Sequence, residues 1–155
     1  EQEALVTSAG AGDAGKIPAL DTNGKLHVSL LPTGFGTPTY TGTAGEALAA
    51  GDFVYIESNG NVRKADASAA NAAKAAVGFV LSAVANGASA TVYLEGNNDA
   101  RSSLTVGALY FLSASSPGGV TTTAPTTAGH LVQALGRAIN STTIAFDPDI
   151  IAIRG

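Results

Sequence analysis

The residues of this chain that could carry out nucleophilic or metal chemistry are few and lie far apart. The sequence has no cysteine and only two histidines, His27 and His130. A serine nucleophile needs a base and an acid within hydrogen-bond reach, and no Gly-x-Ser-x-Gly turn is present to hold one. Zinc sites need three or four ligands at local spacing, which two distant histidines do not supply. We therefore expect no catalytic residue, no metal site and no enzyme activity.

Three short segments are similar to ligand-binding motifs, and each has a plainer interpretation. Residues 10–15 match Gly-x-Gly-x-x-Gly, but this fingerprint needs a strand before it and a helix after it, and Pro18 follows within three residues. We interpret them as a hinge and expect no cofactor. Residues 21–24 lack the glycine and glutamate spacing of a calcium loop and predict a turn. Residues 147–149 (Asp-Pro-Asp) could offer carboxylates to a cation, but proline there favours the end of a strand.

The charge and hydropathy of the chain limit its partners. The net charge is -4, and the only adjacent basic pair is Arg63-Lys64, whereas binding of nucleic acid needs clustered basic residues. The longest nearly apolar run, 75–85, has about half the length that a membrane span needs. We expect neither partner. Charged residues make up 13% of the chain, which indicates that other subunits cover part of its surface.

The elements expected to position any site follow from a repeat. Residues 48–64 (LAAGDFVYIESNGNVRK) return in altered form as 104–120 (LTVGALYFLSASSPGGV). In each copy a glycine precedes a run of strand formers, and a second glycine-bearing turn and a short strand follow. The matching order of residue types in the two segments favours a duplicated β unit, although a chain rich in alanine and glycine can also produce such a repeat by chance.

Short strands separated by turn residues predict an all-β body. Asn-Gly at 59–60 and 86–87 is a strong local signal for hairpins, because both residue types tolerate positive φ. We expect strands near residues 53–57, 62–65, 77–84, 90–95, 108–113, 120–123, 130–139 and 142–146. About eight short strands at this spacing indicate a small barrel or sandwich. Residues 66–76 are rich in alanine, and a short helix and an ordered loop both remain open there.

The first 43 residues differ from the rest. Their density of glycine and proline rules out a long helix and predicts an extended N-terminal arm over 1–43, followed by a β body over 44–155. Apolar residues recur in the arm, where a free tail would gain nothing from them. We therefore expect the arm to bind a partner through Ile17, Leu20, Leu26, Val28, Leu30 and Leu31.

Several short segments, none of them diagnostic by itself, together resemble one protein family. Residues 12–34 (GDAGKIPALDTNGKLHVSLLPTG) and the body segments EALAAGDFVYI, GFVLSAVANGASATVYLEG, LTVGALYFLS and LVQALGRAI resemble the small head-decoration, or capsid cement, proteins of tailed bacteriophages. The resemblance extends from about residue 12 to residue 146. GKIPALDTNGKL followed by SLLP is also similar to connecting repeats of phage tail fibres.

The resemblance implies a virion structural protein on the outer surface of the DNA-filled head. It implies a homo-oligomer, commonly a homotrimer, that clamps neighbouring subunits of the major capsid protein, stabilises the capsid and has no catalytic role. The alternative is a trimeric module of a tail fibre or host-facing appendage, which could bind carbohydrate through Tyr40, Tyr55, Tyr93 or Tyr110. A small histidine-dependent hydrolase carried on the virion is a remote third class.

Overall fold

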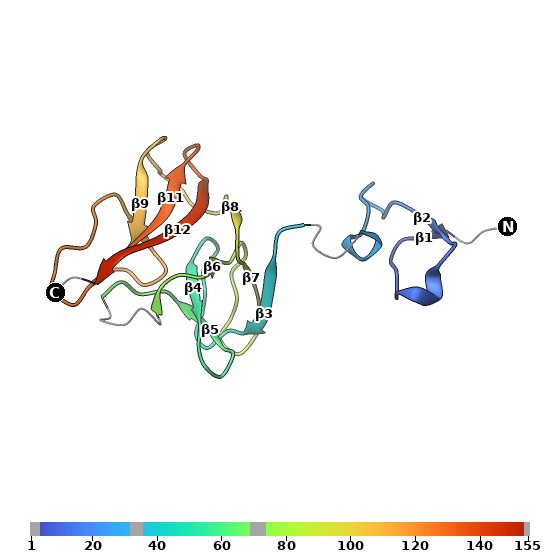
Figure 1. Cartoon of the computed structure of the whole chain (residues 1–155), viewed down its shortest axis with the longest axis horizontal. Helices are drawn as coiled ribbons and strands as arrows, with labels where there is room; N and C mark the ends of the chain where they lie inside the picture. The colour runs from blue at the N-terminus through green and yellow to red at the C-terminus, as the bar shows by residue number, and fades with distance from the viewer. Residues whose placement is uncertain (1–3, 32–35, 69–73, 154–155) are drawn as a thin grey trace. The chain divides into compact units, whose positions relative to one another are not determined.

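The chain forms two separate units. A computed structural model describes residues 4–31, 36–68 and 74–153. The contacts divide the chain into Glu1–Gly36 and Thr37–Gly155, and Figure 1 draws both units. Residues 39–43, which we assigned to the arm, form a strand of the second unit. The N-terminal arm is therefore shorter than the 1–43 expected from the sequence.

The first unit is held by short elements and tight turns. Its strands β1 (Ala4–Leu5) and β2 (Ile17–Pro18) pair in parallel, and its 3-10 helices are η1 (Ala11–Asp13) and η2 (Val28–Leu30). A bridge between Leu20 and Leu26 closes the turn predicted at 21–24. Sheets this small are marginal without further packing.

The second unit is a sandwich of two five-stranded sheets. The first sheet has the order β3-β7-β6-β4-β5, and the second has the order β10-β9-β11-β12-β8. The first sheet contains β3 (Thr39–Thr43), β4 (Phe53–Ile56), β5 (Val62–Lys64), β6 (Gly78–Phe79) and β7 (Ser89–Tyr93). The second contains β8 (Gly96–Asn98), β9 (Leu109–Leu112), β10 (Val120–Thr121), β11 (Leu131–Ala138) and β12 (Ile144–Ile153). This confirms the all-β prediction.

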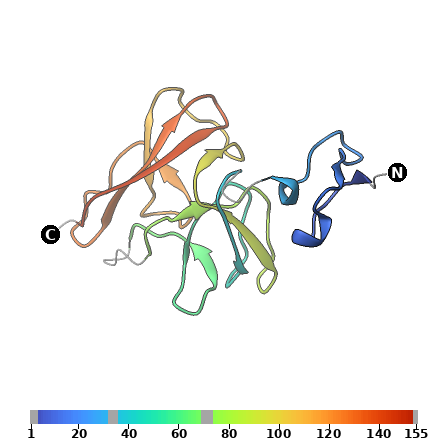
Figure 2. The ribbon, with the colours of Figure 1, turned by 45° about the vertical axis from the view of Figure 1, so that its right-hand side comes forward.

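Two predicted elements differ from the structure, and a third falls largely outside its described residues. The strand expected at 77–84 is limited to β6, because Val80 to Val84 leave the sheet in a longer connection. The strand expected to stop before Pro148 continues to Ile153, as the long red strand near the C-terminus in Figure 2. The register of β11 and β12 shifts at this point, which leaves the proline in an irregular part of the pairing. The expected helix or loop at 66–76 falls largely on 69–73, outside the described residues.

The two sheets repeat one topology, in agreement with the duplicated sequence. Each sheet begins at one edge with the second strand of a short hairpin, β5 in the first sheet and β10 in the second. Listed from that edge, the orders β5-β4-β6-β7-β3 and β10-β9-β11-β12-β8 are equivalent. The turn glycines also make equivalent bonds. The amide of Gly51 donates to the carbonyl of Val80 at 2.7 Å, and the amide of Gly107 donates to the carbonyl of Ala138 at 2.8 Å. The same local structure is thus built twice.

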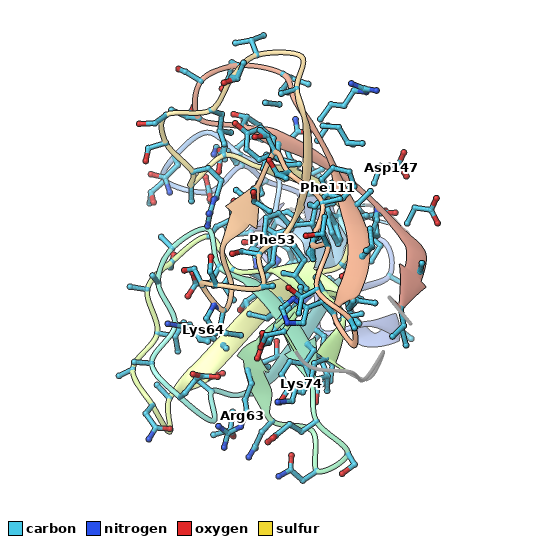
Figure 3. The ribbon with its side chains drawn as sticks, turned by 90° about the vertical axis from the view of Figure 1, so that its left-hand side faces the viewer. Phe53, Arg63, Lys64, Lys74, Phe111 and Asp147 are labelled. Atoms are coloured by element: carbon cyan, nitrogen blue, oxygen red, sulfur yellow. The ribbon has the colours of Figure 1, made fainter. Side chains whose placement is uncertain are left out.

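The main core lies between the sheets and is centred on three phenylalanines. The ring of Phe146 lies 5.5 Å from that of Phe53 and 5.6 Å from that of Phe79. Figure 3 shows Phe53 among the side chains inside the body. Tyr110 is also buried, whereas Phe111 alternates to the opposite face of β9 and is half-buried. Burial of these aromatic rings provides much of the stabilising apolar area.

A second core lies on the other face of the first sheet, which curls. Its edge strands meet where Ala44 forms a bridge with Val62 and the Tyr40 hydroxyl donates to the carbonyl of Gly60 at 2.8 Å. The buried members of this core are Ala44, Leu48, Val54, Val62, Val80, Ala90 and Val92. The curl explains why β3 is an integral part of the body.

Candidate functional site

The apolar residues expected to bind a partner are exposed in the first unit. Relative to a fully accessible side chain, Ile17 is 50% exposed, Leu20 61% and Leu26 40%. Val6, which the sequence analysis did not single out, is 43% exposed. Four of the eight large apolar side chains that are exposed among the described residues thus fall in the short first unit, and the other four, Val77, Val106, Ile139 and Ile153, are spread over the much longer second unit. We call Val6, Ile17, Leu20 and Leu26 the exposed apolar set.

A tight turn holds two members of this set. One carboxylate oxygen of Asp21 accepts hydrogen bonds from the amide of Asn23 at 2.8 Å and from the amide of Lys25 at 2.9 Å. The bond from Lys25 is the main cause that holds the pKa of the Asp21 carboxyl below its usual value. The chain thus reverses direction and brings Leu20 and Leu26 into register as a bridged pair.

The remaining predicted arm residues lie elsewhere in the same unit. Leu30 and Leu31 are half-buried and line a groove of about 310 Å³, together with Leu5 and the ion pair between Asp13 and Lys16. The side chain of Val28 lies outside the described part of the chain. The structure therefore does not place all six predicted residues on one surface, because Leu30 and Leu31 are partly used in packing their own unit.

The described residues of this unit carry balanced charge. Residues 4–31 contain two acids, Asp13 and Asp21, and two bases, Lys16 and Lys25, so their formal charges cancel, and two N-terminal glutamates give the whole unit, 1–36, a net charge of -2. The Lys16 ammonium lies 3.2 Å from the carboxylate of Asp13, whose pKa is lowered chiefly by a hydrogen bond from the amide of Ala9. A weakly charged surface with exposed aliphatic side chains is suited to an apolar partner surface and has no excess of basic residues to offer a phosphate.

The residues considered for catalysis make ordinary local contacts. The ring of His27 is exposed and lies 2.8 Å from the hydroxyl of Ser29, two residues along the chain. His130 is half-buried at the start of β11. Residues 10–15 contain η1, a three-residue 3-10 helix, in place of the longer helix that directs amides at a pyrophosphate. Asp147 and Asp149 are exposed on β12, where Figure 3 shows Asp147 at the edge of the body.

Basic residues of the body have acidic neighbours. Arg63 lies 2.9 Å from the carboxylate of Glu57, and Lys64 lies 3.6 Å from that of Asp52. Figure 3 shows Arg63 and Lys64 toward one end of the body. The single basic pair noted in the sequence is thus compensated locally. Arg63 and Glu57 are partly exposed, and such a pair contributes little to stability, whereas Asp52 is buried.

The four tyrosines considered for carbohydrate binding differ in exposure. Tyr110 is buried, and its hydroxyl oxygen accepts a bond from the amide of Thr105 at 2.9 Å. Tyr40 and Tyr55 are half-buried, and burial raises the pKa of the Tyr55 hydroxyl. Tyr93 is half-buried against Phe79 and also lines a surface groove.

Comparison with known families and curated proteins leaves the chain without a match. No protein-family model and no curated protein matches the sequence. Among the described residues, no group of three or more histidine, aspartate or glutamate side chains is arranged to hold a metal ion. No helix in the described parts of the chain is long and apolar enough to cross a membrane. The assignment of function therefore depends on the residues themselves.

Proposed function

We propose that this chain is a capsid decoration protein of a tailed bacteriophage, which binds the outer surface of the head and stabilises contacts between major capsid subunits. The observation that carries the proposal is the exposed apolar set of the first unit, Val6, Ile17, Leu20 and Leu26. A unit this small, with strands of two residues, buries little apolar surface by itself and gains stability from a partner. The family resemblance supplies the kind of partner.

The proposed role is mechanical. Packaged DNA pushes the shell outward, and a protein that bridges two capsid subunits adds interface that must break before the lattice opens. Binding to the assembled state alone stabilises that state by mass action. In this proposal the first unit supplies the apolar contact, and the sandwich supplies a rigid body that oligomerises, as a trimer at three-fold positions of the lattice.

Co-sedimentation with phage heads tests this function. Purified protein is mixed with undecorated, expanded heads and, in parallel, with intact host cells. Saturable binding to heads alone is the expected result. Binding to cells without binding to heads would contradict the proposal and favour the alternative, a tail-fibre or host-facing module.

A further inference from the structure

A groove of about 350 Å³ lies beside the outward face of β7. The side chains of Ser89, Thr91 and Tyr93 alternate along β7 and therefore share this face. The connection 80–88 between β6 and β7 forms the other wall, from which Leu81, Ser82 and Val84 line the groove together with three alanines. No lining residue is charged, so the groove offers an aromatic ring, small apolar side chains and hydroxyl groups.

The aromatic ring in this groove is held in place from behind. Tyr93 stacks on Phe79 with ring centroids 5.8 Å apart and an angle of 18° between the ring planes. Phe79 is only 1% exposed and belongs to the core between the sheets. Because Phe79 covers one face of the Tyr93 ring, the ring is available to a ligand from its other side, with little conformational freedom left to lose.

A row of hydroxyl side chains continues from the groove onto the edge strand. In the antiparallel pair of β3 and β7, the cross-strand partners of Tyr93, Thr91 and Ser89 are Thr39, Thr41 and Thr43. Opposed residues in such a pair project from the same face. All three β3 threonines are exposed. The surface beside the groove is therefore a regular array of hydroxyl groups.

The second repeat has the same topology without the aromatic ring and without the long connection at the equivalent place. Tyr93 pairs with Phe79 in the first sheet, and the equivalent pair in the second sheet is Ala145 with Arg137. The connection 139–143 between the equivalent strands is also shorter than 80–88. Because one copy of the fold does without the ring and the long connection, neither is needed to build the repeat.

We propose that this groove binds one unit of a neutral saccharide. Sugars present an apolar C–H face and a rim of hydroxyl groups, and this groove has a fixed aromatic ring beside the hydroxyls of Ser82, Ser89 and Thr91. The threonines of β3 contact the next units of the saccharide chain. An uncharged lining offers no cationic partner to the carboxylate of an acidic sugar. This site is on the body and is independent of head binding by the first unit.

The test is an NMR titration of the isotope-labelled full chain. Glucose, galactose, N-acetylglucosamine and rhamnose are added separately, at up to roughly tens of millimolar, with glucuronate as the charged comparison. The expected result is a saturable shift of amide signals confined to residues 81–93 and to β3, produced by at least one neutral sugar and not by glucuronate. Failure of all four neutral sugars to shift these signals would overturn the proposal.

Two variants and a matched control complete this test. Ala88→Leu fills the groove from an exposed position and should weaken binding by at least about tenfold. Thr91→Val removes one hydroxyl at constant size and should weaken it by about fivefold. Ala128→Leu changes an exposed alanine outside the groove and should bind as the unchanged chain does. Undiminished binding by both groove variants would contradict the site.

Discussion

Two buried side-chain amides join loops to strands in the body. Asn98 donates to the carbonyl of Gly51 at 2.9 Å. Gln133 accepts a bond from the amide of Ala76 at 2.7 Å and donates to the carbonyl of the same residue at 2.8 Å. Both amide side chains are at most 2% exposed. Gln133 thus pairs both backbone groups of Ala76, as the backbone of a neighbouring strand would.

Replacing Gln133 by leucine should destabilise the body. The substitution keeps the side chain large and apolar but leaves the amide and the carbonyl of Ala76 buried without these partners. Each unsatisfied group costs about 1–3 kcal/mol, so we expect a loss of about 2–5 kcal/mol in the free energy of unfolding, measured by urea denaturation. The control Asn97→Leu replaces an exposed amide side chain of β8 and should change the free energy of unfolding by less than about 0.5 kcal/mol. Equal stability of the two variants would refute this role of Gln133.

The turn at Asp21 should depend on pH. The pKa of Asp21 is lowered from an ordinary value of 3.8, so the folded turn favours the carboxylate. Its contribution is fully present above pH 3.8 and is lost as the pH falls through the lower pKa of the folded state. We expect the NMR signals of the Asn23 and Lys25 amides to move over that acidic range. Asp21→Asn keeps an acceptor oxygen and should abolish the change, and an unaltered pH profile in this variant would contradict the account.

At the scale of elements, one glycine in each repeat allows two strands to approach closely. A Cβ atom at Gly136 would overlap the carbonyl oxygen of Ala145, and one at Gly78 would overlap that of Tyr93. Gly136 also has a φ of 130°, which L-residues rarely adopt. The two positions are equivalent in the duplicated topology, so the same constraint is met twice.

Substitution of Gly136 by alanine should disturb the pairing of β11 with β12. We expect a loss of about 3 kcal/mol or more in the free energy of unfolding, because backbone strain and steric overlap both oppose the native pairing. Gly87→Ala is the matched control. Gly87 has a positive φ but open space around its Cα, and the substitution should cost about 1 kcal/mol. Thermal unfolding of both variants compares them, and a Gly136→Ala protein as stable as Gly87→Ala would contradict this explanation.

The start of β3 sets where the chain can be shortened. The boundary at residue 43 expected from the sequence implies that a chain without residues 1–40 keeps a folded body. The structure places Tyr40 against the core of the first sheet and bonds its hydroxyl to Gly60. We now expect a chain that begins at Thr37 to unfold as the intact body does, and one that begins at Thr41 to be less stable by about 2–4 kcal/mol. Equal melting temperatures would show that the N-terminal half of β3 contributes nothing.

The sequence predicted the elements whose signals are local. β4 and β9 follow from runs of aliphatic and aromatic residues that begin after a glycine turn, and β5 follows from the Asn-Gly turn that precedes it. β3 and β8 were missed because they consist mainly of threonine, glycine and asparagine. They form strands since β7 and β12 offer them a pairing edge, and that edge exists only after the rest of the sheet has folded.

The candidate sites were predictable only where their signal is local in the sequence. The density of glycine and proline indicated that Ile17, Leu20 and Leu26 would find little burial in their own segment. Leu30 and Leu31 are half-buried beside a groove that Leu5 also lines, and no local sequence pattern indicates that these distant residues share it. The groove beside β7 depends on both the length of the connection 80–88 and the register of β3 with β7. The positions of the four tyrosines in the sequence therefore did not single out Tyr93.

At the scale of the whole molecule, two units with different properties share one chain. The sandwich buries Phe53, Phe79, Tyr110 and Phe146 and contains two hydrophobic cores. The first unit keeps an exposed apolar set on a scaffold of turns and two-residue strands. We interpret the sandwich as the stable body and the first unit as the part that completes its burial on a partner, which in our proposal is the phage capsid.

Binding isotherms on undecorated expanded heads test this account most directly. Four proteins are compared by co-sedimentation: the full chain, a chain that begins at Thr37, the variant Leu20→Asn and the control Thr22→Asn, which changes an exposed polar residue of the same turn. We predict saturable binding by the full chain and the control, binding weakened at least about tenfold by Leu20→Asn, and none by the shortened chain. Binding of the shortened, folded chain with the affinity of the full chain would contradict the proposal that the first unit carries the contact.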